Sequence, residues 1–169
     1  MESPDLYTRL IALLDAQGAH YRLIEHAPEG RTEVVSPLRG NALAQAAKCM
    51  VVMVKLGKKV TKYVLAVVPG DARVDLGAIK TLLGGTYAAF ASPEIAERLA
   101  GSVVGTVLPF SFHPDLHPIA DPTLLEHPEL FFNAARLDRS LALRTADYTR
   151  LAAPQIAPIA ARPEPTAAT

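Results

Sequence analysis

Apolar and polar residues recur along this chain with two periods, one typical of helices and one typical of strands. Near the beginning, Leu6, Leu10, Leu13 and Leu14 fall at helical spacing and predict an amphipathic helix that Gly18 ends. Other helices are predicted where a capping residue precedes a short periodic stretch. Helices are expected at residues 4–17, 32–38, 75–84, 93–101 and 145–151, with caps at Ser3, Asp75, Ser92 and either Thr145 or Asp147.

Two stretches are dense in β-branched and apolar residues and predict a pair of strands. They cover residues 46–56 and 62–68, and the turn Gly57-Lys58-Lys59-Val60 joins them into the clearest hairpin of the chain. Their nearly continuous apolar character favours a central pair that is covered on both faces. Shorter strands are expected at residues 20–25, 87–91, 118–121, 129–134 and 140–144.

The order of these elements predicts the fold class. Hairpins and helices follow each other irregularly, which indicates a mixed α/β (α+β) fold with helices outside a mixed sheet. With 169 residues, of which 50% are hydrophobic, residues 1–152 are expected to form a single domain. From Ala153 the chain is rich in Ala and Pro with few large apolar residues, so we predict a disordered tail at residues 153–169.

Charge and cysteine content narrow the function classes. The formal net charge is zero, so no overall field attracts DNA or an anionic membrane, and recognition of nucleic acid would be local, at one end. The single cysteine excludes an internal disulfide and fits a reducing compartment. Neither a signal peptide nor an apolar stretch of membrane-spanning length is apparent. We therefore expect a soluble cytoplasmic protein.

Residues 101–113 (GSVVGTVLPFSFH) form the most informative loop. Gly105 permits a positive φ or a close backbone approach, and Pro109 fixes its own φ and removes one donor. The loop is expected to expose Phe110-Ser111-Phe112. It is either a plain turn between elements or a preformed backbone surface for a small polar ligand.

Lys48, Cys49 and Asn133 are the candidate polar residues of the strands. Lys48 interrupts an apolar strand, so it either contacts a phosphate or carbonyl group of a ligand or extends to solvent. Cys49 is a candidate nucleophile, but adjacent strand residues point to opposite faces, so Lys48 should not activate it, and a buried core cysteine is favoured. Asn133 either binds a ligand through its amide or stabilises the turn at its strand end.

Histidine, serine and glycine patterns indicate no cofactor. His113 and His117 have the spacing of a helical metal pair, but a proline follows each, which favours a loop over a metal site. Gly-x-Ser-x-Gly, Walker and Rossmann patterns are absent from the sequence.

Taken in order, these features resemble the YbaK/ProX family, the stand-alone relatives of the prolyl-tRNA synthetase editing domain. The shared pattern is a lysine opening a central strand (Ala47-Lys48), a return strand leading to Asp75-Leu76, a Gly-x-x-x-Pro loop (Gly105 to Pro109), a strand closing on a small-residue turn (131–135) and a final Ala146-Asp147 helix. The resemblance covers residues 6–151 and is nearest to the subgroup whose loop reads Pro-Phe-Ser-Phe-His.

This resemblance implies a curved, barrel-like central sheet and hydrolysis of the ester in mischarged aminoacyl-tRNA, a proofreading step in trans. It implies small residues such as Ala, Ser, Thr or Cys on tRNA for proline, with the synthetase or an elongation factor as further partners. A terminal ribose hydroxyl of the substrate would help to place or activate the water. By position, Lys48 would be catalytic, and the substrate-binding residues would be Gly105, Thr106, Pro109, Phe110, Ser111, Asn133 and Ala134.

Two positions depart from many relatives. Ala135 stands where glycine is frequent, which puts the shape of the turn after Asn133 in doubt. Phe110 replaces a smaller residue and would narrow the pocket or stack on the adenine. Two other hypotheses compete with the deacylase, namely a non-catalytic module that binds a nucleotide or tRNA 3′ end, and a metal-dependent hydrolase that uses His113 and His117.

Overall fold

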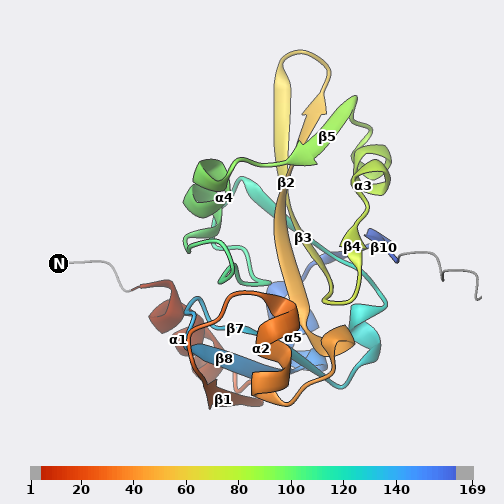
Figure 1. Ribbon diagram of the computed structural model, residues 1–169. Coiled ribbons are helices and arrows are strands. Elements are labelled where there is room, and N and C mark those ends of the chain that lie inside the picture. The colour runs from red at the N-terminus through yellow and green to blue at the C-terminus, as the bar shows by residue number, and fades with distance from the viewer. Residues whose placement is uncertain (1–4, 163–169) are drawn as a thin grey trace, which may run out of the picture.

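Figure 1 shows the computed structural model, which describes residues 5–162. A five-stranded sheet has the order β5-β2-β3-β6-β9, a three-stranded sheet has the order β1-β8-β7, and β4 pairs with β10. The strands are β1 (Tyr21–Glu25), β2 (Ala47–Leu56), β3 (Val60–Pro69), β4 (Arg73–Val74), β5 (Tyr87–Phe90), β6 (Leu116–Ala120), β7 (Glu129–Asn133), β8 (Arg139–Arg144), β9 (Gln155–Ile156) and β10 (Ala160–Ala161). The helices are α1 (Leu6–Ala16), α2 (Thr32–Arg39), α3 (Leu76–Leu83), α4 (Pro93–Ala100) and α5 (Thr145–Ala152), with short 3₁₀ turns at Leu43–Gln45 and Leu124–Glu126.

The predicted hairpin β2–β3 is the longest feature of the fold. Its ten residue pairs run from Ala47 opposite Pro69 to Leu56 opposite Val60. Gly57 makes the turn with a φ of 77°, which a residue with a side chain rarely adopts. The hairpin lies in the centre of the five-stranded sheet, with residues 52–55 of β2 paired with β5, and only its turn end projects from the molecule (Figure 1).

Two hydrophobic cores lie on opposite sides of β2 and β3. The larger core includes Leu10, Leu65 and Tyr148, and it joins the five-stranded sheet to the three-stranded sheet and to α1 and α5. The smaller core includes Val64 and Ile79, and α3 covers it. The sequence prediction of a hairpin covered on both faces is confirmed, because alternate residues of β3 enter different cores.

The mixed fold class is confirmed, but the barrel-like sheet is not. Among the described residues the three sheets stay open, and only an isolated bridge from Ala46 to Phe131 links the two larger ones. Within residues 5–162 the pairing between these sheets does not extend beyond this bridge, so they do not close into a barrel. No helix in residues 5–162 is long and apolar enough to cross a membrane.

Helix caps agree with the sequence except at two helices. Asp75 and Ser92 accept hydrogen bonds from Ala78 and Ile95 and cap α3 and α4, as predicted. Asp5 caps α1, and the expected cap Ser3 lies outside the described residues. At α5 the predicted cap is wrong: the N-cap is Arg144, without a side-chain cap.

Thr145 and Asp147 instead form hydrogen bonds between α5 and distant parts of the chain. The Thr145 hydroxyl donates to the carbonyl of His127, and Asp147 accepts from the backbone amide of His20 at 2.8 Å. Long-range partners therefore use the side chains that the local pattern assigned to the helix start.

The predicted disordered tail is wrong for residues 153–162. Gln155–Ile156 adds a parallel strand to β6, and Ala160–Ala161 pairs with β4. Ile159 is fully buried in the smaller core, and the Asp121 carboxylate accepts hydrogen bonds from Ile159 and Ala160. Strand pairing, a large buried apolar side chain and a buried acceptor therefore hold this Pro-rich segment against the rest of the fold. Residues 163–169 lie outside the described residues.

Candidate active site

Within residues 5–162, strand β2 has no neighbouring strand along part of one edge. The Ala91 amide, just after β5, donates to the Val51 carbonyl at 3.0 Å. The next pairing on this edge is the parallel bridge between Ala46 and Phe131. In the described part of the chain, residues 47–50 therefore face a gap between the two larger sheets.

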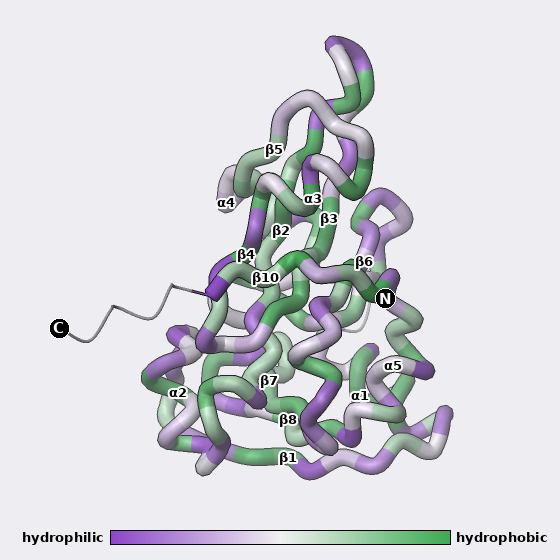
Figure 2. The backbone as a smooth tube through the Cα atoms, turned by 90° about the vertical axis from the view of Figure 1, so that its right-hand side faces the viewer, coloured by the Kyte–Doolittle hydropathy of each residue, from purple (hydrophilic) through white to green (hydrophobic). Residues whose placement is uncertain are grey.

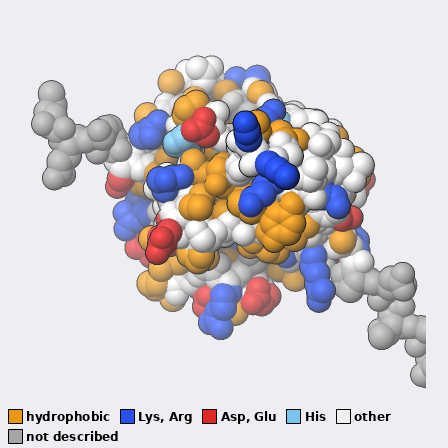
Figure 3. Space-filling view, turned by 90° about the horizontal axis from the view of Figure 1, so that it is seen from above, with side chains coloured by type: hydrophobic (Ala, Val, Ile, Leu, Met, Phe, Trp, Pro, Cys, Tyr) orange, Lys and Arg blue, Asp and Glu red, His pale blue; other side chains and the backbone are white. Residues whose placement is uncertain are grey.

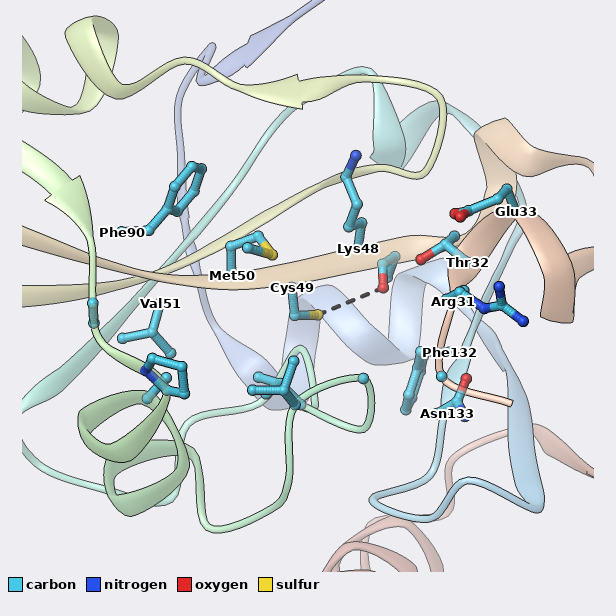
Figure 4. A pocket seen from close by; sticks show the side chains of 18 of the residues that line it. Arg31, Thr32, Glu33, Lys48, Cys49, Met50, Val51, Phe90, Phe132 and Asn133 are labelled. Carbon is cyan, nitrogen blue, oxygen red and sulfur yellow. Dashed lines mark hydrogen bonds between the residues drawn. The ribbon is translucent and has the colours of Figure 1, made fainter. Parts of the chain in front are cut away.

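The backbone of β2 presents hydrogen-bonding groups to this gap. The N–H and C=O groups of alternate strand residues point to the same edge, so those of Cys49 face the gap as the Val51 carbonyl does. A pocket of about 390 Å³ occupies the gap (Figure 4). Its lining comes from α2 and the turn before it, β2, the β5–α4 junction, the 101–113 loop and β7.

The side chains of β2 divide the pocket into two sides. Lys48 and Met50 lie on one side of the strand, together with Phe90, whereas Cys49 and Val51 lie on the other (Figure 4). This arrangement confirms that Lys48 and Cys49 do not meet. Because the strand has a free edge here, a ligand in the gap can reach both sides.

Lys48 stands at the pocket with its ammonium group half-buried. Its Nζ donates to the carbonyl of Ala72. Burial lowers the pKa of Lys48, while the carboxylates of Glu33 and Asp71 oppose this change. Among residues 5–162, Lys48 has no carboxylate within ion-pair distance, and its partly exposed ammonium group provides a positive charge at the pocket wall.

Cys49 lines the pocket and packs against the larger core. Its thiol donates weakly to the Ala47 carbonyl at 3.6 Å. Burial raises the pKa of the thiol, so Cys49 remains protonated at neutral pH. A protonated thiol is a poor nucleophile, which agrees with the favoured interpretation of Cys49 as a packing residue.

Gly105 and Gly30 close one end of the pocket through direct backbone contact. Gly105 has a φ of 93°, and a Cβ at this position would lie 3.0 Å from the Gly30 Cα. A Cβ at Gly30 would in turn lie 3.1 Å from the Gly105 Cα. The loop therefore needs glycine for both reasons that the sequence suggested, and it brings backbone groups to the pocket. Sequence reasoning placed Gly30 only in a turn and did not assign it to the site.

The other predicted residues of this loop support it from behind. Thr106 donates to the Val103 carbonyl, and the Pro109 carbonyl accepts a hydrogen bond from Tyr148. Ser111 donates to the carbonyls of His113 and Leu116. The pocket lining does not include Thr106, Pro109, Ser111 or the fully buried Ala134.

Phe110 is buried, so the expectation that the loop exposes it is wrong. Only 5% of Phe110 is exposed, and its ring meets Tyr148 edge-on at 5.4 Å between centroids. It also lies 6.3 Å from Phe132, whose side chain lines the pocket. Burial of a phenyl ring in the core is more favourable than exposure, so Phe110 supports the pocket wall and does not enter the pocket.

Asn133 lines the pocket, but its amide is occupied by the protein. Its Nδ2 donates to the Glu29 carbonyl at 2.8 Å and to the Arg136 carbonyl at 3.1 Å. Its Oδ1 accepts from Arg39 at 3.2 Å. Asn133 thereby fixes the turn that carries Gly30.

Arg39 is a pocket residue that sequence reasoning missed. It is buried, donates to Asn41, Asn133 and Ser140, and has no carboxylate partner among the described residues. Burial lowers its pKa to about 10. Its position at the end of a short polar helix gave no hint, because its partners are distant in the sequence.

Ala135 has the left-handed conformation that glycine adopts easily, with a φ of 62°. A residue with a Cβ pays about 1–2 kcal/mol for this conformation. The turn after Asn133 therefore keeps a glycine-like shape although the chain has alanine there.

His113 and His117 take separate hydrogen bonds. His113 accepts from the Asp115 amide at 3.0 Å, and His117 lies 2.8 Å from the Gln155 side chain. Within residues 5–162, no group of three or more His, Cys, Asp or Glu side chains is arranged to hold a metal ion.

Comparison with known proteins places the chain in a family. The model of the aminoacyl-tRNA editing domain matches residues 26–151. The chain is 46% identical over 151 residues to the multifunctional Ser/Thr-tRNA deacylase ProXp-y of Escherichia coli strain K12. The aligned residues make up 89% of this chain and 90% of that protein. The protein of the same name from Escherichia coli O157:H7 matches equally well.

Solved structures share the fold. A candidate trans-editing enzyme for prolyl tRNA synthetase has a TM-score of 0.76 at 25% identity, covering 95% of this chain and 99% of its own. A hypothetical protein has a TM-score of 0.81 at 20% identity, covering 90% and 99%, which shows a common fold. From the match over residues 26–151 and the identity to the two Escherichia coli proteins, the chain belongs to the aminoacyl-tRNA editing domain family.

Proposed function

We propose that this protein is an aminoacyl-tRNA deacylase that hydrolyses the ester of mischarged tRNA in trans, and that the gap beside β2 holds the aminoacyl end. The observation that carries the proposal is the free edge of β2 inside a pocket of about 390 Å³, between Lys48 and the Gly105 loop. This volume is in the range of small-ligand sites.

The residues of the pocket favour catalysis by positioning. Burial raises the pKa of the Cys49 thiol and makes it a poor nucleophile, and water is the proposed attacking group. The water oxygen adds to the ester carbonyl carbon, the bond from that carbon to the ribose oxygen breaks, and a proton passes to the ribose oxygen. Backbone groups at Cys49 and Gly105 would orient the ester, and the positive charge of Lys48 would stabilise the negative charge that develops.

Small hydroxyl amino acids are the proposed substrates. The Escherichia coli relatives are named Ser/Thr-tRNA deacylases, and the pocket side of Cys49 is formed by Val51, Val107 and Phe132, which leaves room for a compact side chain. Ala and Cys esters, and tRNA for proline as the carrier, remain expectations of the family resemblance. Contact with prolyl-tRNA synthetase or an elongation factor likewise remains an expectation.

A deacylation panel with Ser-, Thr-, Ala- and Cys-charged tRNA tests the proposal. Lys48→Ala is expected to lower the rate constant by about 100-fold, the usual effect of removing one group that stabilises developing charge. Lys80→Ala is the matched control, because Lys80 lies on α3 and is the one lysine outside residues 48–62.

The panel also separates the deacylase from a non-catalytic module that binds the tRNA 3′ end. If the wild-type protein leaves every ester at the background rate, the proposal is wrong and the binding module is favoured. If Lys48→Ala and Lys80→Ala have equal rates, the assigned role of Lys48 is wrong.

A further inference from the structure

The lysines of this neutral chain are confined to one segment. Five of its six lysines lie between residues 48 and 62, and no Asp or Glu occurs from residue 34 to residue 70. Those 37 residues carry six positive charges, because Arg39 adds one, and the rest of the chain carries the balancing negative excess. A net charge of zero therefore conceals a strong separation of charge.

The fold places these lysines on the projecting hairpin. Lys55, Lys58, Lys59 and Lys62 are exposed on the outer half of β2–β3, which we call the basic arm (residues 55–62). In the part of the chain that the structure describes, every ion pair uses an arginine or a histidine as its cation. The charges of the basic arm are thus available to an anionic partner.

The basic arm continues directly from the pocket. Met50 lines the pocket, and Leu56 at the end of β2 lies six residues further along the strand, which corresponds to ~20 Å at ~3.3 Å per residue; Lys58 lies in the turn just beyond. Lys62 stands opposite Val54, and Lys55 stands opposite Thr61, so neighbouring lysines occupy both faces. Hydrophilic residues mark the tip in Figure 2.

An exposed aromatic residue accompanies the lysines. Tyr87 of β5 pairs with Lys55 and is 52% exposed. Seen from the arm end, Lys and Arg side chains flank an apolar area (Figure 3). Exposed lysines suit the phosphates of nucleic acid, and an exposed aromatic ring beside them can stack on an unpaired base next to a stem.

We propose that the basic arm binds the phosphates of the tRNA acceptor stem while the aminoacyl end occupies the pocket. This inference rests on the proposed deacylase function and assigns a second contact to the same substrate. It revises the expectation that neutral charge restricts recognition to the terminal nucleotide. Because the arm is fixed to β2, its distance from the pocket would select substrates with a stem at that distance.

The test compares Lys58→Ser/Lys59→Ser with Arg22→Ser/Arg144→Ser. Each double variant removes two positive charges, but Arg22 and Arg144 lie on β1 and β8, at the opposite end of the molecule from the arm (Figure 1). Both are assayed on Ser-charged tRNA and on a seryl ester of a short single-stranded oligonucleotide that ends in CCA.

On charged tRNA at low salt, the arm variant is expected to lose roughly tenfold in kcat/KM. This variant should also have a slope of log kcat/KM against log salt concentration that is less negative by about 1.5. On the short ester it should match the wild type within about twofold, and the arginine variant should match on both substrates. Melting curves check that both variants fold.

Three other results would contradict the role of the basic arm or the deacylase function itself. If the wild type hydrolyses both esters and the arm variant equals it on tRNA at every salt concentration, the basic arm does not bind the stem. If both lysine and arginine variants weaken equally, the effect is one of total charge and the inference is overturned. If the wild type hydrolyses neither ester, the deacylase proposal itself fails.

Discussion

Gly105 carries the most specific structural requirement of any single residue in the pocket. It combines a φ of 93° with contact to the backbone of Gly30, whereas Gly84 has a φ of 68° and open space around its Cα. Gly105→Ala should cost about 1–2 kcal/mol in backbone strain and also push the two loops apart. We expect deacylation to fall by at least about tenfold, since misplacement of a binding loop is costly.

Gly84→Ala is the control for this prediction. It has a similar backbone penalty without the contact, so the free energy of unfolding should fall while activity per folded molecule stays at the wild-type level. Rates measured together with chemical denaturation separate the two effects. Equal activity losses in both variants would show that backbone strain, rather than the Gly30 contact, is responsible.

Phe110 lies behind the pocket wall, whereas Phe90, to which the sequence pattern assigned no role, lines the pocket. Phe110→Ala empties a buried site and should reduce the free energy of unfolding by about 3–5 kcal/mol. Phe90 is 48% exposed at the pocket, so Phe90→Ala should change stability by less than about 1 kcal/mol and mainly raise KM. Denaturation and steady-state kinetics on both variants test this. A stable Phe110→Ala protein with a raised KM would contradict it.

At the scale of elements, local patterns identified the segments that have strong periodicity. The β2–β3 hairpin and α3, with its Asp75 cap and Gly84 end, could be predicted because their signals are contiguous in the sequence. Strands β9 and β10 are only two residues long, and their pairing depends on β6 and β4. No local signal could reveal them.

Ile159 and Ile156 test how the C-terminal segment is held. Both are isoleucines of one short segment, but Ile159 is 0% exposed and Ile156 is 50% exposed. Ile159→Ala should cost about 3–4 kcal/mol, whereas Ile156→Ala should cost less than about 1 kcal/mol. Urea denaturation measures both. Equal values would mean that the segment does not close the smaller core.

At the scale of the whole molecule, three carboxylates with lowered pKa values predict sensitivity to acid, and two of them, Asp121 and Asp147, link distant parts of the chain. Hydrogen bonds from Arg31 lower the pKa of Glu29 to about 2. The His20 amide lowers the pKa of Asp147, and hydrogen bonds from Thr123, Ala160 and Ile159 outweigh burial and lower that of Asp121.

A carboxylate whose pKa is lower in the folded protein than in the unfolded chain stabilises the fold when it is ionised in both states. This stabilisation is complete above the pKa of the unfolded chain and is lost as the pH falls through the pKa of the folded protein. The free energy of unfolding should therefore be level from pH 7 to about pH 5 and fall steadily from about pH 4.5 to pH 2. Denaturant titrations across this range measure it. Asp121→Asn should flatten part of the decline, and a constant free energy down to pH 3 would refute the prediction.

The sequence by itself determined the mixed fold class, most helices and strands, the family and the central positions of Lys48, Gly105 and Asn133, because these depend on local periodicity and ordered motifs. Only the tertiary structure decided which loop residues reach the pocket and that Arg39 and Gly30 belong to it. It also decided that residues 153–162 pack against the smaller core and β6. Such contacts join residues that are far apart in the chain, and burial is set by what surrounds a side chain. The sequence pattern therefore identified the loop at residues 101–113, but core packing determined that Phe110 lies behind the pocket wall.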